Sequence, residues 1–114
     1  MPTTEIPLPT VLESTYIVVW EYQVKAECQT EFVAAYGPDG EWARLFRRSP
    51  EFLGVELLAA VGNAGRFFTL DHWCSAAAMD VFMSANATAY DVLDRRFSGF
   101  MVWERRIGGF PSDA

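Results

Sequence analysis

The stretch Tyr16–Val24 carries apolar side chains at both odd and even positions, and this property constrains the fold more than any other feature of the sequence. Its residues, YIVVWEYQV, are rich in β-branched and aromatic side chains, which favour a β-strand. Because successive side chains of a strand point to opposite faces, Trp20 and Tyr22 share one face, whereas Ile17 points to the other. A sheet built on this strand therefore needs an apolar partner on each face.

Three further strands and several helical segments are expected in the rest of the chain. β-branched and aromatic residues between turn signals favour strands at residues 52–60, 66–74 and 100–107. Apolar residues at helical spacing favour helices at residues 28–36, 42–46 and 76–97, the last with a slip near residues 85–87. The order is β-α-β-β-α-β, which predicts a ferredoxin-like α+β fold with an antiparallel sheet.

The chain of 114 residues has room for a single domain. We place this domain at residues 16–108, between an irregular proline-containing arm at residues 1–15 and a short tail at residues 109–114. Two side chains are candidate helix N-caps, because their oxygen can accept a hydrogen bond from a free backbone N–H: Asp39 and Ser75.

The helices of this topology cover only one face of the sheet, so the other face needs a second sheet. A second copy related by a two-fold axis supplies one most simply. Apolar residues make up 51% of the chain and aromatic residues 15%, which is a surplus for a monomer of this size. We therefore expect a homodimer.

Acidic residues outnumber basic ones, with fifteen Asp and Glu against nine Lys and Arg and a net charge of −6. This balance repels phosphate backbones and anionic lipid surfaces, so neither nucleic acid nor a membrane is an expected partner. The basic pairs Arg47–Arg48 and Arg95–Arg96 are expected at helix C-terminal ends, where cations complement the helix dipole.

Two sequence features bear on the compartment. No apolar run approaches the ~20 residues that span a bilayer, and the first residues lack the basic start of a signal peptide, so a cytoplasmic location is expected. Cys28 and Cys74 form no CxxC pair, so both are expected to be free thiols, with a single bridge as the alternative.

Residues 71–79, DHWCSAAAM, place a strand-ending Trp73 two residues before the helix-capping Ser75. This stretch, with Phe82 at a fitting distance, resembles the antibiotic biosynthesis monooxygenase superfamily of dimeric α+β barrels. Residues 32–58, with YGPDG and LFRR motifs, are similar to a bacterial branch of it. The resemblance implies that the sheets of two subunits close into a shared barrel, with one pocket per subunit between sheet and helices.

The resemblance implies a cofactor-independent monooxygenase that acts on an aromatic or polyketide-like small molecule. An electron-rich, deprotonated substrate can itself reduce dioxygen, so the protein needs to supply only an apolar cavity, a proton acceptor and donors to the anionic oxygen. Two alternatives use the same pocket: a non-catalytic or stress-responsive barrel that binds a small molecule, and a polyketide cyclase or isomerase.

Other relatives degrade heme, and their axial histidine lies on the second helix. Here that region reads NATAY at residues 86–90, and Tyr90 is its one conceivable iron ligand. Neither a cofactor nor a metal is expected.

Asp71, Tyr22 and Trp73 are the candidate catalytic residues. Trp73 matches the strand-end Trp that lines the pocket in several relatives, with a plain core position as the alternative. The Tyr22 phenol can donate a hydrogen bond to a ligand oxygen. Burial of Asp71 on the pocket face would raise its pKa toward a value useful to a general base, although an ion pair with an arginine is the favoured interpretation.

Six further residues are candidates for substrate binding: Trp20, Phe67, Thr69, Phe82, Asn86 and Tyr90. The first three follow from strand parity, and Phe82 follows from the spacing of the resemblance. The last two lie where the second helical pattern slips, which is where relatives place polar pocket residues.

Two glutamates and the single histidine are expected to have other roles. Glu21 and Glu104 lie on strands and are expected to pair with Arg66 or Arg105 across the sheet. His72 points away from the pocket face by alternation and is expected at the sheet interface or rim. One histidine provides neither a His-rich metal cluster nor an independent Ser-His-Asp triad.

Overall fold

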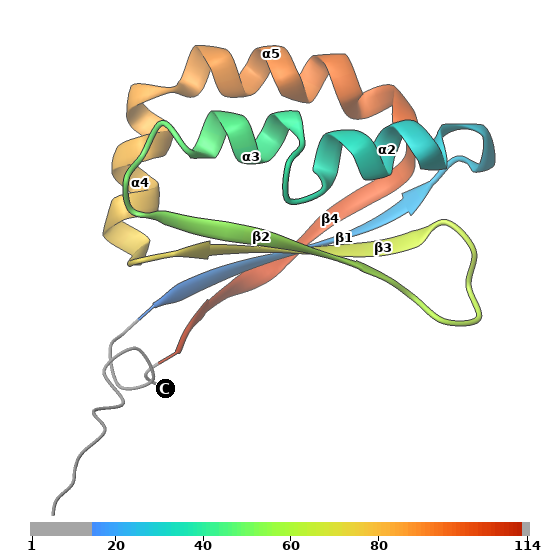
Figure 1. Ribbon diagram of the computed structural model, residues 1–114, viewed down its shortest axis with the longest axis horizontal. Helices are drawn as coiled ribbons and strands as arrows, with labels where there is room; N and C mark the ends of the chain where they lie inside the picture. Colours follow the sequence, from blue (N-terminus) through green and yellow to red (C-terminus); the bar gives the residue numbers. More distant parts are fainter. Residues whose placement is uncertain (1–14, 113–114) are drawn as a thin grey trace, which may run out of the picture.

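The computed structural model describes residues 15–112 and shows a four-stranded antiparallel sheet with its helices on one face (Figure 1). The strands are β1 (Tyr16–Val24), β2 (Phe52–Ala59), β3 (Arg66–Trp73) and β4 (Met101–Pro111), in the order β2-β3-β1-β4 across the sheet. The helices are α2 (Gln29–Tyr36), α3 (Glu41–Phe46), α4 (Ala76–Ala85) and α5 (Ala87–Phe97), and 3₁₀ turns occur at η1 (Ala26–Cys28) and η2 (Ser98–Phe100). The predicted ferredoxin-like α+β fold is confirmed.

β1 lies between β3 and β4, and its helix-facing side chains lie directly beneath the helical layer. Trp20 pairs with Thr69 on β3 and with Arg106 on β4. Two positions further along, Tyr22 pairs with Phe67 on β3. The residues predicted by parity to share the helix-facing side of the sheet are therefore neighbours across adjacent strands.

β4 continues to Pro111, four residues beyond the predicted end at residue 107. Gly108 and Gly109 pair with Val19 and Val18, after a register shift opposite Val19 and Trp20. A side chain at Gly109 would collide with the hydroxyl of Tyr16, so the glycine leaves room for the Tyr16 side chain beside β4. These glycines continue the strand instead of ending it.

One of the two predicted helix caps is confirmed. The Ser75 hydroxyl accepts a hydrogen bond from the backbone N–H of Ala78 at 3.0 Å, as expected of an N-cap. The prediction for Asp39 is wrong, because α3 begins after Gly40 without a side-chain cap. Asp39 instead accepts a hydrogen bond from Arg44 through its backbone carbonyl.

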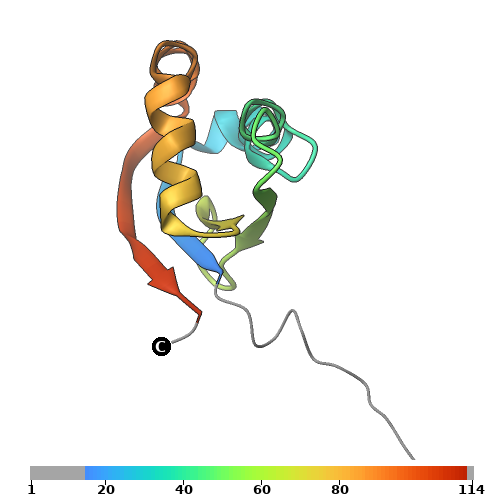
Figure 2. The ribbon, with the colours of Figure 1, turned by 90° about the vertical axis from the view of Figure 1, so that its left-hand side faces the viewer.

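The core lies between the sheet and the helical layer and consists largely of aromatic side chains. Phe32 of α2 is fully buried, and Val18 and Trp73 are each 1% exposed. Figure 2, which is turned by 90° from Figure 1, shows α2 and α3 beside α4 and α5 over the same side of the sheet. The apolar helix-facing sides of the strands are therefore covered within one chain.

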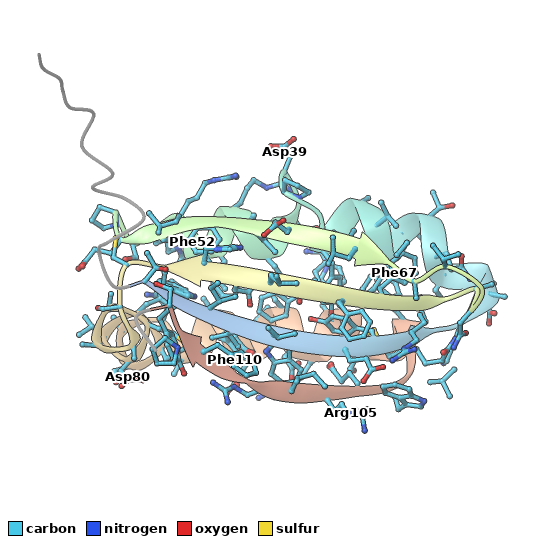
Figure 3. All side chains as sticks on the ribbon, turned by 90° about the horizontal axis from the view of Figure 1, so that it is seen from below. Asp39, Phe52, Phe67, Asp80, Arg105 and Phe110 are labelled. Carbon is cyan, nitrogen blue, oxygen red and sulfur yellow. The ribbon has the colours of Figure 1, made fainter. Side chains whose placement is uncertain are left out.

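Within residues 15–112, no helix covers the opposite face of the sheet, which Figure 3 shows from below. Large apolar side chains there remain exposed: Leu58 is 46% exposed, Trp103 is 41% exposed and Phe110 is 47% exposed. These three residues belong to the two outer strands, β2 and β4. The sequence prediction of a sheet that is apolar on two sides but covered on one agrees with this arrangement.

Glu21 lies on this open face and confirms the predicted cross-strand ion pairing. Its carboxylate accepts hydrogen bonds from Arg66 at 2.7 Å and from Arg105 at 2.8 Å, and its side chain is only 3% exposed. Burial by itself raises the pKa of Glu21, but the hydrogen bonds and charges of Arg105 and Arg66 outweigh it and lower the pKa. The two arginine side chains, and not a helix, shield this carboxylate.

Cys28 and Cys74 are both free and partly exposed. Within residues 15–112, no helix combines the length and the hydrophobicity that crossing a bilayer requires.

Candidate functional site

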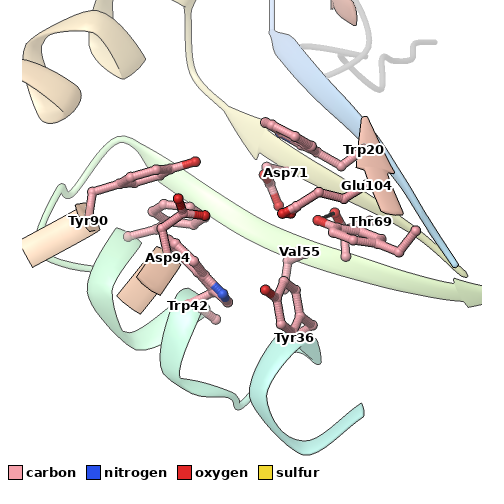
Figure 4. A pocket seen from close by; sticks show the side chains of 12 residues that line it. Trp20, Tyr36, Trp42, Val55, Thr69, Asp71, Tyr90, Asp94 and Glu104 are labelled. Atoms are coloured by element: carbon pink, nitrogen blue, oxygen red, sulfur yellow. Dashed lines mark hydrogen bonds between the residues drawn. The ribbon is translucent and has the colours of Figure 1, made fainter. Parts of the chain in front are cut away.

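A pocket lies between the helix-facing side of the sheet and the helices α2, α3 and α5 (Figure 4). It has a volume of about 40 Å³, and all four strands contribute to its wall. The lining residues are Trp20, Tyr22, Tyr36, Trp42, Ala43, Phe46, Val55, Thr69, Asp71, Tyr90, Asp94 and Glu104. Aromatic side chains and carboxylates therefore dominate the wall.

A second cavity of about 190 Å³ adjoins the pocket and shares Trp20, Phe46, Asp71 and Tyr90 with it. Its other walls come from the sheet and from α4: Val18, Trp73, Met79, Met83 and Arg106. A molecule that enters either space meets the side chain of Asp71. The candidate site is the pair of cavities joined at these shared residues.

Asp71 is the carboxylate at this junction. Burial raises the pKa of Asp71 from its ordinary value of 3.8 to about 7, because the surrounding protein disfavours the charged form. Among residues 15–112, Asp71 takes part in none of the ion pairs or side-chain hydrogen bonds. The favoured sequence interpretation, an ion pair with an arginine, is therefore wrong, and the carboxyl group faces the cavities instead.

Tyr22 and Thr69 form a hydrogen-bonded pair in the wall of the pocket. Their hydroxyl oxygens lie 2.8 Å apart, and both residues are buried. Burial raises the pKa of Tyr22 well above its ordinary value, so the phenol stays protonated at neutral pH. Strand parity correctly placed both residues on this face.

Glu104 also lines the pocket, where the sequence analysis expected a cross-strand ion pair. Glu104 lies opposite Tyr22 on the neighbouring strand, and none of the ion pairs formed by residues 15–112 includes it. Burial, with a smaller contribution from the charge of Asp94, raises the pKa of Glu104. Asp71, Asp94 and Glu104 thus give the pocket wall three carboxyl groups, and the wall contains no Lys, Arg or His.

Tyr36 and Trp42 are pocket residues that the sequence analysis treated only as parts of apolar helix stripes. Tyr36 ends α2 and Trp42 lies in the first turn of α3, and their ring centroids are 6.0 Å apart. Burial raises the pKa of the Tyr36 hydroxyl, and the nearby indole of Trp42 offsets part of that rise. The Trp42 indole nitrogen is buried, and the Tyr36 hydroxyl is its hydrogen-bonding neighbour among the described residues.

Tyr90 of α5 forms the helical side of both cavities. Its ring meets the ring of Trp42 edge-on, with centroids 4.9 Å apart. Burial, with smaller contributions from surrounding carboxylates of which Asp94 is the largest, raises the pKa of Tyr90 to about 12. Tyr90 therefore offers a neutral hydroxyl to the site at physiological pH.

The other predicted site residues lie at different depths. Trp73 is 1% exposed and contributes to the wall of the larger cavity only. Phe67 and Phe82 are buried in the core and line neither cavity. Asn86 lies at the break between α4 and α5, where its side chain donates to the carbonyl of Phe82 and accepts from Arg48.

His72 lies on the open face of the sheet, where its Nε2 is 2.7 Å from a carboxylate oxygen of Glu56. This position agrees with the predicted orientation away from the pocket. Within residues 15–112 there is no group of three or more His, Cys, Asp or Glu side chains that could hold a metal ion.

Solved structures with the same fold include three that match most of the chain. SnoaB, a cofactor-independent oxygenase from Streptomyces nogalater, is 16% identical with a TM-score of 0.64, and the match covers 84% of this chain and 90% of SnoaB. A conserved protein of Methanosarcina mazei Go1 is 14% identical with a TM-score of 0.66, covering 90% of this chain and 97% of that protein. A protein of Lactobacillus acidophilus NCFM is 11% identical with a TM-score of 0.66; the match covers 86% of this chain and only 45% of the Lactobacillus protein.

No protein with a curated description matches the chain. The family model described as antibiotic biosynthesis monooxygenase matches residues 15–88, which include the strands β1, β2 and β3 and the helices α2, α3 and α4. This match covers well over half of the 114 residues. The chain therefore belongs to the antibiotic biosynthesis monooxygenase family.

Proposed function

We propose that this protein is a cofactor-independent monooxygenase that oxygenates an enolisable aromatic or polyketide-like small molecule in the pocket between sheet and helices. The observation that carries the proposal is the carboxyl group of Asp71, which lies between two aromatic-lined cavities with a pKa of about 7. A general base works best when its pKa lies near the working pH. Family membership supports a reaction of this kind, although the fold alone does not determine it.

The reaction would begin with transfer of a substrate C–H or O–H proton to the carboxylate of Asp71. The resulting enolate passes one electron to dioxygen, and the radical pair combines to form a carbon–oxygen bond. The peroxide takes the proton back from Asp71, and loss of water from the hydroperoxide leaves a new carbonyl group. One oxygen atom of dioxygen enters the product and the other leaves as water.

The other pocket residues support this chemistry in two ways. The hydroxyls of Tyr22 and Tyr90 stay protonated at neutral pH and are able to donate hydrogen bonds to an anionic oxygen. The rings of Trp20, Phe46 and Tyr90 line the space next to Asp71 and make its wall largely apolar. Trp73 contributes its ring to the wall of the larger cavity.

We also propose that the protein is a homodimer in which the open faces of two sheets pack together. Leu58, Trp103 and Phe110 are between 41% and 47% exposed on that face, and a second copy would bury them. Glu21 and its two arginines lie on the same face. The pocket lies on the other, helix-covered side of the sheet, so this packing would not bury its lining residues in the interface.

Oxygen uptake by the purified protein with a panel of enolisable aromatics of one to three rings, anthrone included, tests the proposed reaction. The expected result is oxygen uptake with incorporation of one labelled atom from ¹⁸O₂, reduced at least about a hundredfold in Asp71→Asn. Asp80→Asn, on the exposed side of α4, is the matched control and should keep full activity. Conversion that proceeds without oxygen would indicate a cyclase or isomerase, and a ligand returned unchanged would indicate a binding protein; either result refutes the oxygenase.

A further inference from the structure

Arg106 brings a positive charge to the wall of the larger cavity. It lies on β4 opposite Trp20 of β1, and both side chains line the cavity of about 190 Å³. Arg106 is exposed to solvent, whereas Val18 and Trp73, which line the same cavity, are each 1% exposed. The cavity therefore extends from buried apolar side chains to an arginine at its solvent-exposed end.

The guanidinium of Arg106 is held at this place by Tyr16 and by the backbone of β4. Its Nη2 donates a hydrogen bond to the Tyr16 hydroxyl at 3.1 Å. A Cβ atom at Gly109 would lie only 2.9 Å from the same nitrogen, so the glycine leaves room for the guanidinium beside the strand. The arginine is thus seated against β4 and does not simply extend into solvent.

Arg106 has no carboxylate partner among residues 15–112. None of the ion pairs that these residues form includes it, and its bond to a neutral hydroxyl leaves further guanidinium N–H donors available. Asp71 lines the same cavity, but burial raises its pKa, whereas a guanidinium beside that carboxyl group would lower it. The two groups therefore lie on separate walls, with the cavity between them.

The charges along the two joined cavities are unequally distributed. Asp94 and Glu104 line the smaller pocket and not the larger cavity, whereas Arg106 lines only the larger cavity. An anionic group of a ligand is repelled by the carboxyl groups of the smaller pocket and attracted by the guanidinium. Because a guanidinium can donate two parallel hydrogen bonds, the anion that fits it well is a carboxylate.

We infer that Arg106 binds the carboxylate of an aromatic ligand whose ring occupies the larger cavity. This inference rests on the proposed function only in taking the joined cavities as the substrate site, and it adds the charge and the orientation of the ligand. The cavity of about 190 Å³ has room for one ring, since an engineered protein cavity of about 150 Å³ takes up benzene. The ligand class is therefore a one-ring phenol or enol with a carboxylate, which Arg106 holds while the ring reaches Asp71.

Binding of 4-hydroxyphenylacetate and of 4-hydroxyphenylacetamide, measured by calorimetry at low ionic strength, tests this site, because the two compounds have nearly the same shape and differ in charge. The native protein should bind the carboxylate roughly tenfold more tightly, the effect of one charge-assisted contact at a solvent-exposed position. In Arg106→Gln the preference should disappear. Arg95→Gln makes the same change of charge at an exposed position outside both cavities and should keep the full preference.

Tyr16→Phe separates the charge of Arg106 from its hydrogen bond. This variant removes the bond that Arg106→Gln also removes, but it keeps the guanidinium. It should retain at least about a threefold preference for the carboxylate, since the charge supplies most of the attraction. A loss as complete as in Arg106→Gln, or an unchanged preference in Arg106→Gln, overturns the inference.

The salt dependence of binding to the unmutated protein remains decisive if Arg106→Gln fails to fold. Raising the NaCl concentration from about 0.05 M to about 0.5 M should weaken binding of the carboxylate several-fold and leave the amide unchanged, because salt screens an attraction at an exposed site. Without a cationic site, a chain with a net charge of −6 would bind the anion more tightly as salt rises. Carboxylate affinity that rises or stays level with salt therefore overturns the inference.

The outcomes for this site and for the proposed reaction are distinguishable. A carboxylate preference that depends on Arg106, without oxygen uptake for any aromatic compound tested, supports the anion site and refutes the oxygenase. Oxygen uptake without a carboxylate preference overturns the anion site alone.

Discussion

The hydroxyl groups of Tyr22 and Thr69 lie 2.8 Å apart on neighbouring strands, where they form a hydrogen bond in the wall of the pocket. Both residues are buried, at 5% and 3% exposure. Because each hydroxyl has the other as its partner, removing one leaves a buried polar group unpaired, and that cost exceeds the value of the bond itself. The pair fixes the Tyr22 ring in the wall of the site.

Tyr22→Phe should lower the free energy of unfolding by about 1–3 kcal/mol, because it leaves the Thr69 hydroxyl buried without a partner. Thr69→Val should have a similar effect. The double variant should lose clearly less than the sum of the two single losses, since no unpaired hydroxyl remains. Urea unfolding of the four proteins measures this coupling, and strictly additive losses would contradict it.

Asp71 should make the protein less stable as the pH rises from about 4 to 7. The folded-state pKa of about 7 lies above the unfolded value of 3.8, so the folded protein holds a proton that the unfolded chain has already released. The stabilisation that protonated Asp71 contributes to the folded protein is fully present below pH 4, and it is lost as the pH rises through 7. The loss is at most about 4 kcal/mol, at about 1.4 kcal/mol per pKa unit, and water in the cavity reduces it.

The matched comparison is Asp71→Asn, which has no proton to release. The free energy of unfolding of the native protein minus that of the variant should fall between pH 4 and pH 7 in urea titrations. A difference that stays level across this range would show that Asp71 titrates at its ordinary pKa.

Glu21 should have the opposite effect at acid pH. Its pKa is lowered in the folded protein by Arg105 and Arg66, which outweigh the effect of burial, so its contribution is present above pH 5 and is lost as the pH falls through the folded pKa. Glu21→Gln should therefore be less stable than the native protein near pH 7, and the two should converge as the pH falls through the folded-state pKa of Glu21. Thermal unfolding followed at several pH values measures the convergence, and parallel curves would rule out this role for Glu21.

Strand parity predicted much of the site, because alternation follows directly from strand geometry. Trp20, Tyr22, Thr69 and Asp71 were placed on one face from β1 and β3 alone, and all four line the pocket. Glu104 was not found, because β4 shifts register between Gln23 and Val24 of its partner strand. This irregularity turns Glu104 toward the helices, and no signal in the sequence marks its position.

Trp42 and Tyr36 were missed for a different reason. Helical periodicity shows that both belong to an apolar stripe, and both are buried as the stripe requires. Periodicity does not set how far α2 and α3 rotate over the sheet, so it cannot separate a core ring from a ring at a cavity wall. The predicted ion pair between Asp71 and an arginine was wrong for a similar reason: the orientations of the arginine side chains depend on tertiary packing, which the sequence pattern does not give. Arg106, opposite Trp20, donates to the hydroxyl of Tyr16 instead.

The open face of the sheet gives the last prediction, which concerns the oligomeric state. Light scattering or sedimentation at micromolar concentration should report twice the mass of the 12.8 kDa chain. Leu58→Lys combined with Phe110→Lys should give a monomer, because each copy would bring two charges into an interface that otherwise buries apolar side chains. Val81→Lys, at a 70% exposed position on α4, changes charge on the helical side and should leave the dimer intact. A stable monomer of the unmodified chain would leave these side chains permanently exposed to water, and the proposed packing of two sheets would then have to be abandoned.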